Sequence, residues 1–245
     1  MPDIFNFGEE VESALAEKRA VVALESTVIA HGLPRPQNLE TALRLEEIVR
    51  ACGAVPATIA ILEGAIHVGL TPAQLEHIAE SLDVHKVSRR DLPVAIAKRL
   101  YGATTVATTS LIAERAGIRV FATGGIGGVH RGALPDVSAD LPELARVNLA
   151  IVCSGAKIVL DLPATREWLE TEGITVIGYC ADEMPAFYSR RSGLEVDVRV
   201  DSPAEVAAIL SARRAINLEG ATLVTVPVPV ESEVKAERLD EVLSL

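Results

Sequence analysis

Two apolar segments of this sequence lead into side chains that can perform acid–base or nucleophilic chemistry. The segment Ala20–Leu24 is followed directly by Glu25, and Leu149–Cys153 is followed four residues later by Lys157. A carboxylic acid at a strand end is a candidate general acid, and an amine held neutral is the nucleophile of Schiff-base chemistry. Each residue also has a structural interpretation, because strand-end acids often cap loops and lone lysines are usually solvated.

A second lysine, Lys86, lies within the short apolar segment Val84–Val87 and is followed by Arg89 and Arg90. An ammonium group inside an apolar strand is expected to lie in a low dielectric, which disfavours its charge. If Lys86 and Lys157 lie near each other, each also disfavours the charge of the other, and one becomes a neutral amine. The two arginines can equally belong to a solvated basic turn.

The segment Phe121–Gly132 contains five glycines in twelve residues. Glycines allow positive φ angles and expose backbone amides, which is how loops approach phosphates and metal-bound ligands. The spacing is not the G-x-G-x-x-G pattern of dinucleotide-binding proteins. The polar residues Asp136, Ser138 and Asp140 follow, either as ligands or as N-capping residues of a helix over Leu141–Arg146.

Short strands alternate with helices along the chain, and these elements must position the reactive side chains. The apolar pattern predicts a hairpin of two strands, Val55–Leu62 and Ala65–Val68, that turns at Glu63 and Gly64. The other expected strands are Ala20–Leu24, Val84–Val87, Thr104–Ala107, Arg119–Ala122, Leu149–Cys153, Thr175–Tyr179, Val196–Val200 and Thr222–Val226. The expected helices are Glu9–Lys18, Gln37–Cys52, one opening at Thr71, Leu92–Leu100, Ser110–Ala116, Thr165–Thr171, Pro203–Ala215 and Val234–Leu243.

This alternation predicts an α/β fold, a single-domain α/β/α sandwich over residues 1–245 around a mostly parallel, mixed sheet. In such sheets ligands bind where loops leave the carboxyl ends of the strands. Glu25 and Lys157 both follow strands at such ends. We therefore expect the chemistry at that edge of the sheet.

The amino-acid composition limits the kinds of partner and compartment that we expect for this protein. Hydrophobic residues make up 49% of the chain and aromatic residues 3%, so the core is built from small aliphatic side chains. The formal net charge of −11 disfavours a nucleic acid as partner, although a small phosphorylated ligand needs only a local cationic pocket. The three cysteines, Cys52, Cys153 and Cys180, form neither a disulfide framework nor a zinc spacing. With no signal peptide and no membrane-spanning apolar run, we expect a cytoplasmic protein.

Several motifs together resemble the pseudouridine-5′-phosphate glycosidase family. They recur in order and at the family's spacing from about Val21 to the Tyr179 strand, and more loosely beyond. They are Ala23–Gly32, Val55–Ala60, Lys86–Pro93, Gly102–Ala107, the glycine-rich loop through Gly132, Ser138–Leu141 and Gly155–Lys157.

The resemblance implies a lyase that reversibly cleaves pseudouridine 5′-phosphate to uracil and ribose 5-phosphate through a lysine Schiff base on ring-opened ribose. It also implies one Mn²⁺ per subunit, a cytoplasmic homo-oligomer, specifically a homotrimer, and no contact with nucleic acid or membrane. By the same resemblance Lys157 is the nucleophile, Glu25 the proton donor and Asp136 the metal ligand. The implied substrate-binding residues are Lys86, Val106, Ser138, Ala139 and Asp140, with Thr105, Thr123 and His130 placed by adjacent motifs.

One departure from the family pattern concerns the C-terminal part. Family members continue past the strand matching Thr222–Val226 with a segment rich in Gly, Ser, Thr and Asn that completes the pocket, whereas this sequence stops at Leu245. The departure leaves two alternatives. One is a Schiff-base lyase acting on another sugar phosphate, and the other is a non-catalytic paralogue that binds a pentose phosphate.

Overall fold

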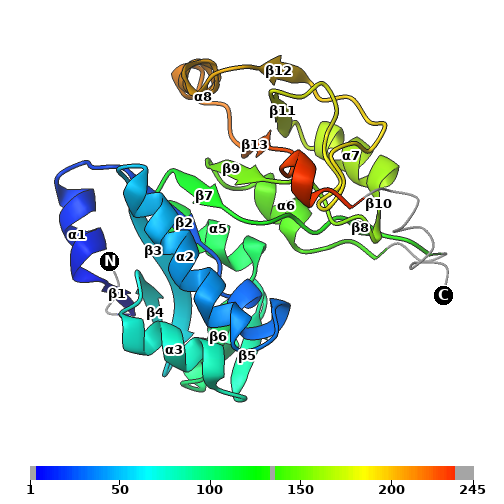
Figure 1. Cartoon of the computed structure of the whole chain (residues 1–245). Helices are drawn as coiled ribbons and strands as arrows, with labels where there is room; N and C mark the ends of the chain where they lie inside the picture. The colour runs from blue at the N-terminus through cyan, green and yellow to red at the C-terminus, as the bar shows by residue number, and fades with distance from the viewer. Residues whose placement is uncertain (1–3, 133–135, 235–245) are drawn as a thin grey trace. The chain divides into compact units, whose positions relative to one another are not determined.

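The computed structural model describes residues 4–132 and 136–234. It divides into two compact units, residues 1–122 and residues 123–245, and each unit is described by itself. Strands and helices alternate along both units (Figure 1). The expectation that the whole chain is one domain stays a prediction.

The sheet of the first unit carries its strands in the order β1-β4-β3-β2-β7. These strands are β1 (Phe5–Phe7), β4 (Ala65–Val68), β3 (Val55–Leu62), β2 (Val21–Leu24) and β7 (Val120–Ala122). Strands β3 and β4 pair antiparallel, which confirms the predicted hairpin, whereas β1–β4, β2–β3 and β2–β7 are parallel pairs.

Two further strands extend this sheet. Strand β6 (Tyr101–Thr104) pairs antiparallel with β3 at Ala60 and Ile61, and β5 (Val84–Val87) pairs parallel with β6. Strand β2 pairs with the first half of β3, where Leu24 lies opposite Thr58. Because β4 occupies the other edge of β3, β2 and β6 lie along the same edge and approach each other end to end. Their carboxyl ends therefore meet beside Ile59.

Helices cover both faces of this sheet. All eight residues of β3 are buried, which requires cover on either side because successive side chains point to opposite faces. The helical segments of the unit are α1 (Glu9–Ala16), a π-helical turn η1 (Val28–Gly32), α2 (Gln37–Ala51), α3 (Pro72–Glu80), α4 (Leu92–Ala97) and α5 (Val106–Arg115). Helix α3 begins with a capping box between Thr71 and Gln74.

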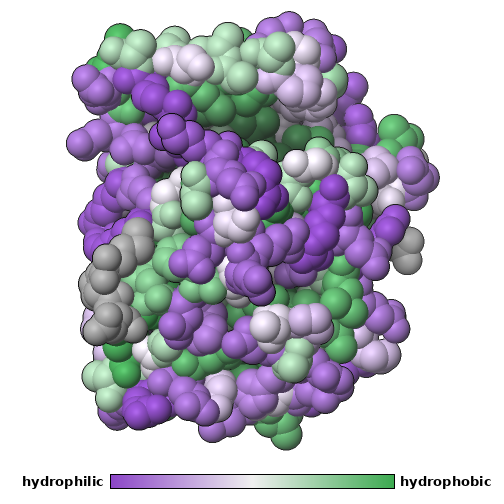
Figure 2. Space-filling model, turned by 90° about the vertical axis from the view of Figure 1, so that its left-hand side faces the viewer, coloured by the Kyte–Doolittle hydropathy of each residue, from purple (hydrophilic) through white to green (hydrophobic). Residues whose placement is uncertain are grey.

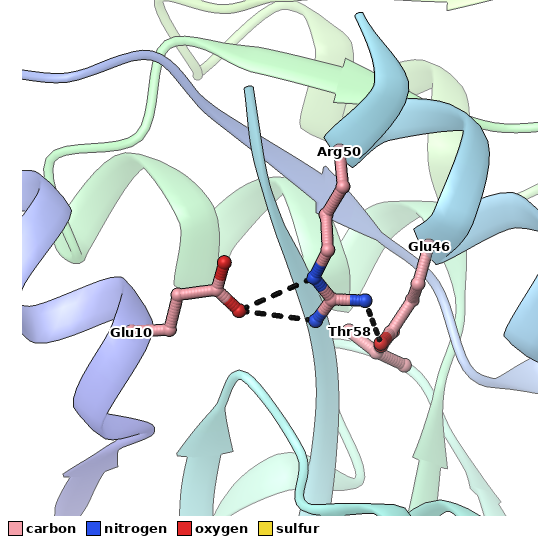
Figure 3. Close-up of polar contacts among 4 residues, drawn as sticks. All are labelled: Glu10, Glu46, Arg50 and Thr58. Carbon is pink, nitrogen blue, oxygen red and sulfur yellow. Dashed lines mark hydrogen bonds and ion pairs between the residues drawn. The ribbon is translucent and has the colours of Figure 1, made fainter. Parts of the chain in front are cut away.

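A polar cluster ties α1 and α2 to β3 (Figure 3). The Arg50 guanidinium donates to the Glu10 carboxylate at 3.0 Å and to the Glu46 carboxylate at 3.3 Å. The hydroxyl of Thr58, on the buried strand, donates to the other oxygen of Glu46 at 2.7 Å. The buried carboxylate of Glu46 thus has a neutral and a cationic donor, which offsets the cost of its burial.

The expected strand Thr104–Ala107 was placed wrongly. Strand β6 ends at Thr104, and α5 begins at Val106. The Thr105 side chain accepts a hydrogen bond from the Thr108 backbone N–H, so it acts as the helix N-cap. The β-branched residues of Thr104–Ala107 favour a strand by propensity, but Thr105 caps a helix that begins within this segment.

The second unit contains a parallel sheet in the order β9-β13-β11-β12. These strands are β9 (Ala150–Cys153), β13 (Thr222–Thr225), β11 (Thr175–Tyr179) and β12 (Val198–Val200). Two short strands that the sequence pattern did not predict, β8 (Val129–His130) and β10 (Leu160–Asp161), pair antiparallel. The helical segments are α6 (Asp140–Leu144), α7 (Leu162–Thr171), α8 (Pro203–Ala215) and the 3₁₀ turn η2 (Val230–Ser232).

The predicted α/β class with a mostly parallel, mixed sheet is confirmed in these pairings. The helix expected over Val234–Leu243 lies outside the described residues, apart from Val234 itself. Among the described residues, no helix is long and apolar enough to cross a membrane.

An apolar cavity of about 590 Å³ in the first unit is separate from the predicted chemistry. It is lined by Ile4 and Phe5, by Ile66 of β4, by residues of α4 and by Arg115. None of the predicted site residues contributes to its lining. Apolar areas alternate with polar ones on the face shown in Figure 2.

Candidate active site

Glu25 follows the last residue of β2 and is half-buried. The hydroxyl of Thr27 donates a hydrogen bond to the Glu25 carboxyl group. The same hydroxyl lies 3.2 Å from the backbone carbonyl oxygen of Thr104, at the end of β6. The carboxyl group is therefore linked through Thr27 to the neighbouring strand end.

A buried hydroxyl network holds these two strand ends together. The Ser26 hydroxyl donates to the Ile59 carbonyl at 2.6 Å, and the Thr104 hydroxyl donates to the same carbonyl at 2.8 Å. The Thr104 backbone N–H donates to the Ser26 oxygen at 2.8 Å, and the Thr109 hydroxyl donates to the Thr104 hydroxyl at 2.9 Å. The network satisfies polar groups that the end-to-end meeting of β2 and β6 would otherwise leave buried and unpaired.

Thr105 and Val106, two predicted substrate-binding residues, lie at the start of α5. Both are buried, and the Thr105 N–H donates to the Val87 carbonyl at 3.1 Å. The Thr105 side chain is engaged as the N-cap, so its place is explained by helix formation. The positive end of the α5 dipole lies at this first turn and favours an anion nearby.

Lys86 lies on β5 with an exposed side chain. Strand β5 pairs with β6 alone among the described strands, so it is an edge strand. The expected low-dielectric environment of Lys86 is therefore wrong within this unit. The arginine pair that follows matches the solvated-turn interpretation in part, because the exposed Arg90 contacts Asp91 at 3.4 Å.

In the second unit, Lys157 lies on a loop that is joined to the glycine-rich loop. The Ile126 N–H donates to the Gly155 carbonyl at 3.0 Å, and the Lys157 N–H donates to the Ile126 carbonyl at 3.2 Å. The Thr123 N–H donates to the Val152 carbonyl at 3.0 Å, which continues this pairing from β9. The Lys157 side chain is exposed, as a nucleophile that must reach a substrate requires.

His130, Asp136, Ser138 and Asp140 surround the same glycine-rich loop. The His130 N–H donates to the Asp136 carbonyl at 2.8 Å, and the Ser138 N–H donates to the Gly128 carbonyl at 2.9 Å. The side chains of His130 and Asp136 are exposed, as is Ala139. The structure thus brings five predicted residues of this unit, with Ala139 included, onto one loop cluster.

Ser138 and Asp140 also have structural roles. The Asp140 carboxylate is buried and accepts the Gly127 N–H at 2.8 Å, and the Ser138 hydroxyl oxygen accepts the Asp140 N–H at 3.2 Å. A side chain at Gly127 would collide with the Ser138 hydroxyl at 2.2 Å. The Ser138 hydroxyl thus accepts a backbone N–H at the start of α6, but the N-cap residue is Ala139, which has no side-chain cap bond, so the N-capping alternative is wrong for both residues. Asp140 instead holds the glycine-rich loop.

Asp136, the predicted metal ligand, is exposed. Among the residues that the structure describes, no group of three or more His, Cys, Asp or Glu side chains could hold a metal ion. The exposed carboxylate of Asp136 fits an ion that keeps most of its water and takes one protein oxygen, as Mg²⁺ and Mn²⁺ do in phosphate-binding sites. It does not fit an ion enclosed by protein ligands.

Sequence reasoning missed the roles of Thr27, Thr104 and Phe187. Phe187 has a left-handed backbone with φ of 60° and packs its ring against Gly124 and Gly125. The threonines stand within the motifs quoted for the family resemblance, but a hydroxyl beside an acid carries no specific signal. Thr27 has the Thr104 carbonyl as its second partner because the carboxyl ends of β2 and β6 lie next to each other.

The alternating helices and mostly parallel strands define an α/β protein. Its first unit carries the strand-end acid Glu25, and its second unit carries Lys157 and the glycine-rich loop. The description "Indigoidine synthase A like protein" matches residues 10–245. The chain belongs to this family.

Curated relatives are similar over almost the whole chain. A protein from Geobacillus kaustophilus named pseudouridine-5′-phosphate glycosidase is 54% identical over 99% of this chain and 81% of its own length. A protein of the same name from Herpetosiphon aurantiacus is 58% identical over 91% of this chain and 74% of its own length.

Solved structures agree with this assignment. An indigoidine synthase A-like protein from Thermotoga maritima is 38% identical with a TM-score of 0.90, over 98% of this chain and 80% of that one. The prealnumycin C-glycosynthase AlnA, solved with ribulose 5-phosphate, is 40% identical with a TM-score of 0.91, over 98% of this chain and 79% of that one.

Proposed function

We propose that this chain is a pseudouridine-5′-phosphate glycosidase, which cleaves the C–C glycosidic bond of its substrate reversibly to uracil and ribose 5-phosphate. The observation that carries the proposal is 54% identity over 99% of the chain to a relative of that name. The solved relative with bound ribulose 5-phosphate adds support for a pentose phosphate as ligand. Glu25 and Lys157 supply an acid and an amine for the chemistry.

Cleavage of the C–C glycosidic bond of pseudouridine 5′-phosphate cannot rely on the usual pair of glycosidase carboxylates alone. In an O-glycoside an acid protonates the leaving oxygen. In pseudouridine the sugar is joined to a ring carbon of uracil, so the bond contains no such oxygen. Protonation must therefore begin elsewhere on the substrate.

The first step opens the ribose ring. Glu25 donates its proton to the ring oxygen, the bond between that oxygen and the anomeric carbon breaks, and the neutral amine of Lys157 forms a bond to the anomeric carbon. The nitrogen lone pair becomes the new C–N bond. The proton that the nitrogen loses is available for a later step.

The second step releases the base. The nitrogen lone pair forms a C=N bond while the electron pair of the C–C bond passes to the uracil carbon, which takes up a proton. Water then adds to the iminium carbon, the C–N bond breaks, and ribose 5-phosphate leaves with the lysine restored. The net reaction is the addition of one water molecule across the C–C bond.

The remaining predicted residues bind and orient the substrate. Thr105 and Val106 lie at the start of α5, where the positive end of the helix dipole suits a phosphate or another anion. The exposed ammonium group of Lys86 would contact the sugar phosphate. Ser138, Ala139 and Asp140 hold the glycine-rich loop against the ligand, with Thr123 and His130 beside them.

Asp136 would hold a divalent ion that prefers oxygen ligands, and we expect Mn²⁺. Water would fill most of the coordination shell of the ion. When bound, such an ion polarises nearby oxygens and orients water. We further place the protein in the cytoplasm as a homotrimer. The free cysteines Cys52, Cys153 and Cys180 agree with a reducing compartment.

The test is incubation of the purified chain with pseudouridine 5′-phosphate and Mn²⁺ while uracil formation is followed by absorbance. Uracil and ribose 5-phosphate should appear in equal amounts. A parallel incubation with other sugar phosphates tests the alternative of a different Schiff-base lyase. Binding of a pentose phosphate without any turnover would instead show a non-catalytic paralogue.

A further inference from the structure

The hydroxyl of Thr27 stands between two oxygens. It is bonded to the Glu25 carboxyl group and lies 3.2 Å from the Thr104 backbone carbonyl. A hydroxyl carries one proton and two acceptor lone pairs, whereas a backbone carbonyl can only accept. The hydroxyl can thus donate fully to one of these oxygens while its lone pairs remain open to a donor from the other side.

We propose that Thr27 is a positioning residue that holds the Glu25 carboxyl group in place in both of its protonation states. This inference rests on the proposed function, in which Glu25 is the proton donor. With the Glu25 proton on Oε1, where it can face the substrate, the Thr27 hydroxyl donates to Oε2 and stays within reach of the Thr104 carbonyl. After Glu25 has given that proton to the substrate, the same hydroxyl still donates to the carboxylate at Oε2.

No heavy atom has to move between the two states. Neither proton nor electron is gained or lost by Thr27. The energetic advantage lies in pre-organisation, because both forms of the acid keep a hydrogen bond in the same geometry.

The surroundings fix Thr27 in its position. Its acceptor, the Thr104 carbonyl, belongs to a residue whose N–H and hydroxyl are bonded to Ser26 and Ile59. The Ser26 carbonyl in turn accepts the N–H groups of Ile29 and Ala30 at 3.0 and 3.1 Å, which closes the chain around Thr27. A β-branched side chain has few χ1 states, so its hydroxyl is held at a defined point.

The experiment compares Thr27→Val with Thr27→Ser. Valine keeps the shape and removes the hydroxyl, whereas serine keeps the hydroxyl. We expect the kcat of Thr27→Val for cleavage of pseudouridine 5′-phosphate to fall by about 10- to 100-fold, with KM changed by less than about threefold, and Thr27→Ser to restore most of kcat. Thr27→Ala repeats the removal with a smaller side chain, in case valine prevents folding.

Thr109→Val is the matched control. It removes another hydroxyl of the same buried network, which bonds to Thr104 and not to Glu25. This variant should melt at a lower temperature and keep the kcat of the wild type. If Thr27 only stabilised the fold of the loop, Thr27→Val and Thr109→Val would both lower the melting temperature and both keep the kcat of the wild type.

A double-mutant cycle tests whether Thr27 acts through Glu25. In the Glu25→Gln background, Thr27→Val should cause no further loss of kcat. If Thr27→Val lowers kcat in the Glu25→Gln background as much as in the wild type, Thr27 does not act through Glu25. An unchanged kcat for the single variant Thr27→Val would equally contradict the positioning role, while leaving the proposed function intact. A wild-type chain that releases no uracil refutes the proposed function itself, and the role falls with it.

Discussion

At the scale of single residues, Glu25 illustrates how a hydroxyl network can serve a reactive acid. Its carboxyl group contacts Thr27, and Thr27 reaches the end of β6. The buried residues Ser26 and Thr104 converge on the Ile59 carbonyl and fix both strand ends. Glu25 therefore follows a strand end that is held rigidly, which its proposed role as proton donor requires.

Replacing Glu25 by Gln tests its role as the proton donor. The amide keeps the volume and the hydrogen-bonding shape of the protonated acid but has no proton to transfer. We expect cleavage of pseudouridine 5′-phosphate to slow by roughly two to four orders of magnitude, while the melting temperature and substrate binding stay close to those of the wild type. Steady-state kinetics and a thermal melt measure both. Retention of more than about a tenth of the wild-type rate, far from the expected loss, would make Glu25 a structural loop acid.

The sequence predicted Glu25 and Lys157 because each follows an apolar strand, but it did not predict Thr27. Its second partner, Thr104, lies 77 residues away along the chain. That contact exists because β2 and β6 meet end to end along β3, and no local pattern encodes such a meeting. The exposure of Lys86 was missed for the same reason, since a short apolar strand does not show whether it lies at a sheet edge.

At the scale of elements, the loops after β7 and β9 form one structure. Gly155 is central to it, because its carbonyl accepts the Ile126 N–H and its φ of 82° lies in the left-handed region. A Cβ atom at this position would lie 1.9 Å from the Pro185 carbonyl oxygen. The loop that carries Lys157 therefore depends on a residue without a side chain.

Gly155→Ala should displace this loop. The left-handed backbone costs an alanine about 1–2 kcal/mol, and the collision with Pro185 adds to that cost. We expect a lower melting temperature and a lower rate of cleavage. Gly173→Ala is the matched control, because Gly173 is also left-handed, with φ of 68°, but has nothing within 4 Å of the added atom. Equal melting temperatures for the two variants would contradict the close packing against Pro185.

The loop that carries Asp136 leads to a prediction about metal. Because one exposed carboxylate holds an ion weakly, a chelator should remove it readily and abolish cleavage, and added Mn²⁺ should restore the rate. Asp136→Asn should raise the Mn²⁺ concentration needed for half of the full rate. Asp83→Asn, at an exposed aspartate on the first unit, is the control that should leave it unchanged. Full activity after exhaustive chelation would remove the metal from the proposed chemistry.

Element prediction succeeded where one local signal dominated. The antiparallel hairpin across Glu63 and Gly64 was predicted, as was the helix Pro203–Ala215, which has a serine cap and a proline in its first turn. The two-residue strands β8 and β10 were not, because each is formed by its partner rather than by its own apolar pattern. The start of α5 was misread because valine and threonine favour strands by propensity, while the capping by Thr105 decides the structure.

At the scale of the whole molecule, the chain is a mostly parallel α/β structure whose reactive residues follow strand ends in each of its two units. Continuous apolar strands such as β3 and β13, buried along their full length, predicted this class correctly. The core is aliphatic, as the 3% aromatic content implied. The names of the curated relatives, and the solved relative with ribulose 5-phosphate, then connect this architecture with sugar-phosphate chemistry.

The most direct test of the central claim is to trap the covalent intermediate on the whole chain. Borohydride added during turnover of pseudouridine 5′-phosphate should reduce the iminium and fix one pentose phosphate per chain, seen as a mass increase of the intact protein. Peptide mapping should place the added mass on Lys157, and Lys157→Ala should not be labelled. Uracil release with the label on another lysine, or with no label at all, would contradict Lys157 as the nucleophile.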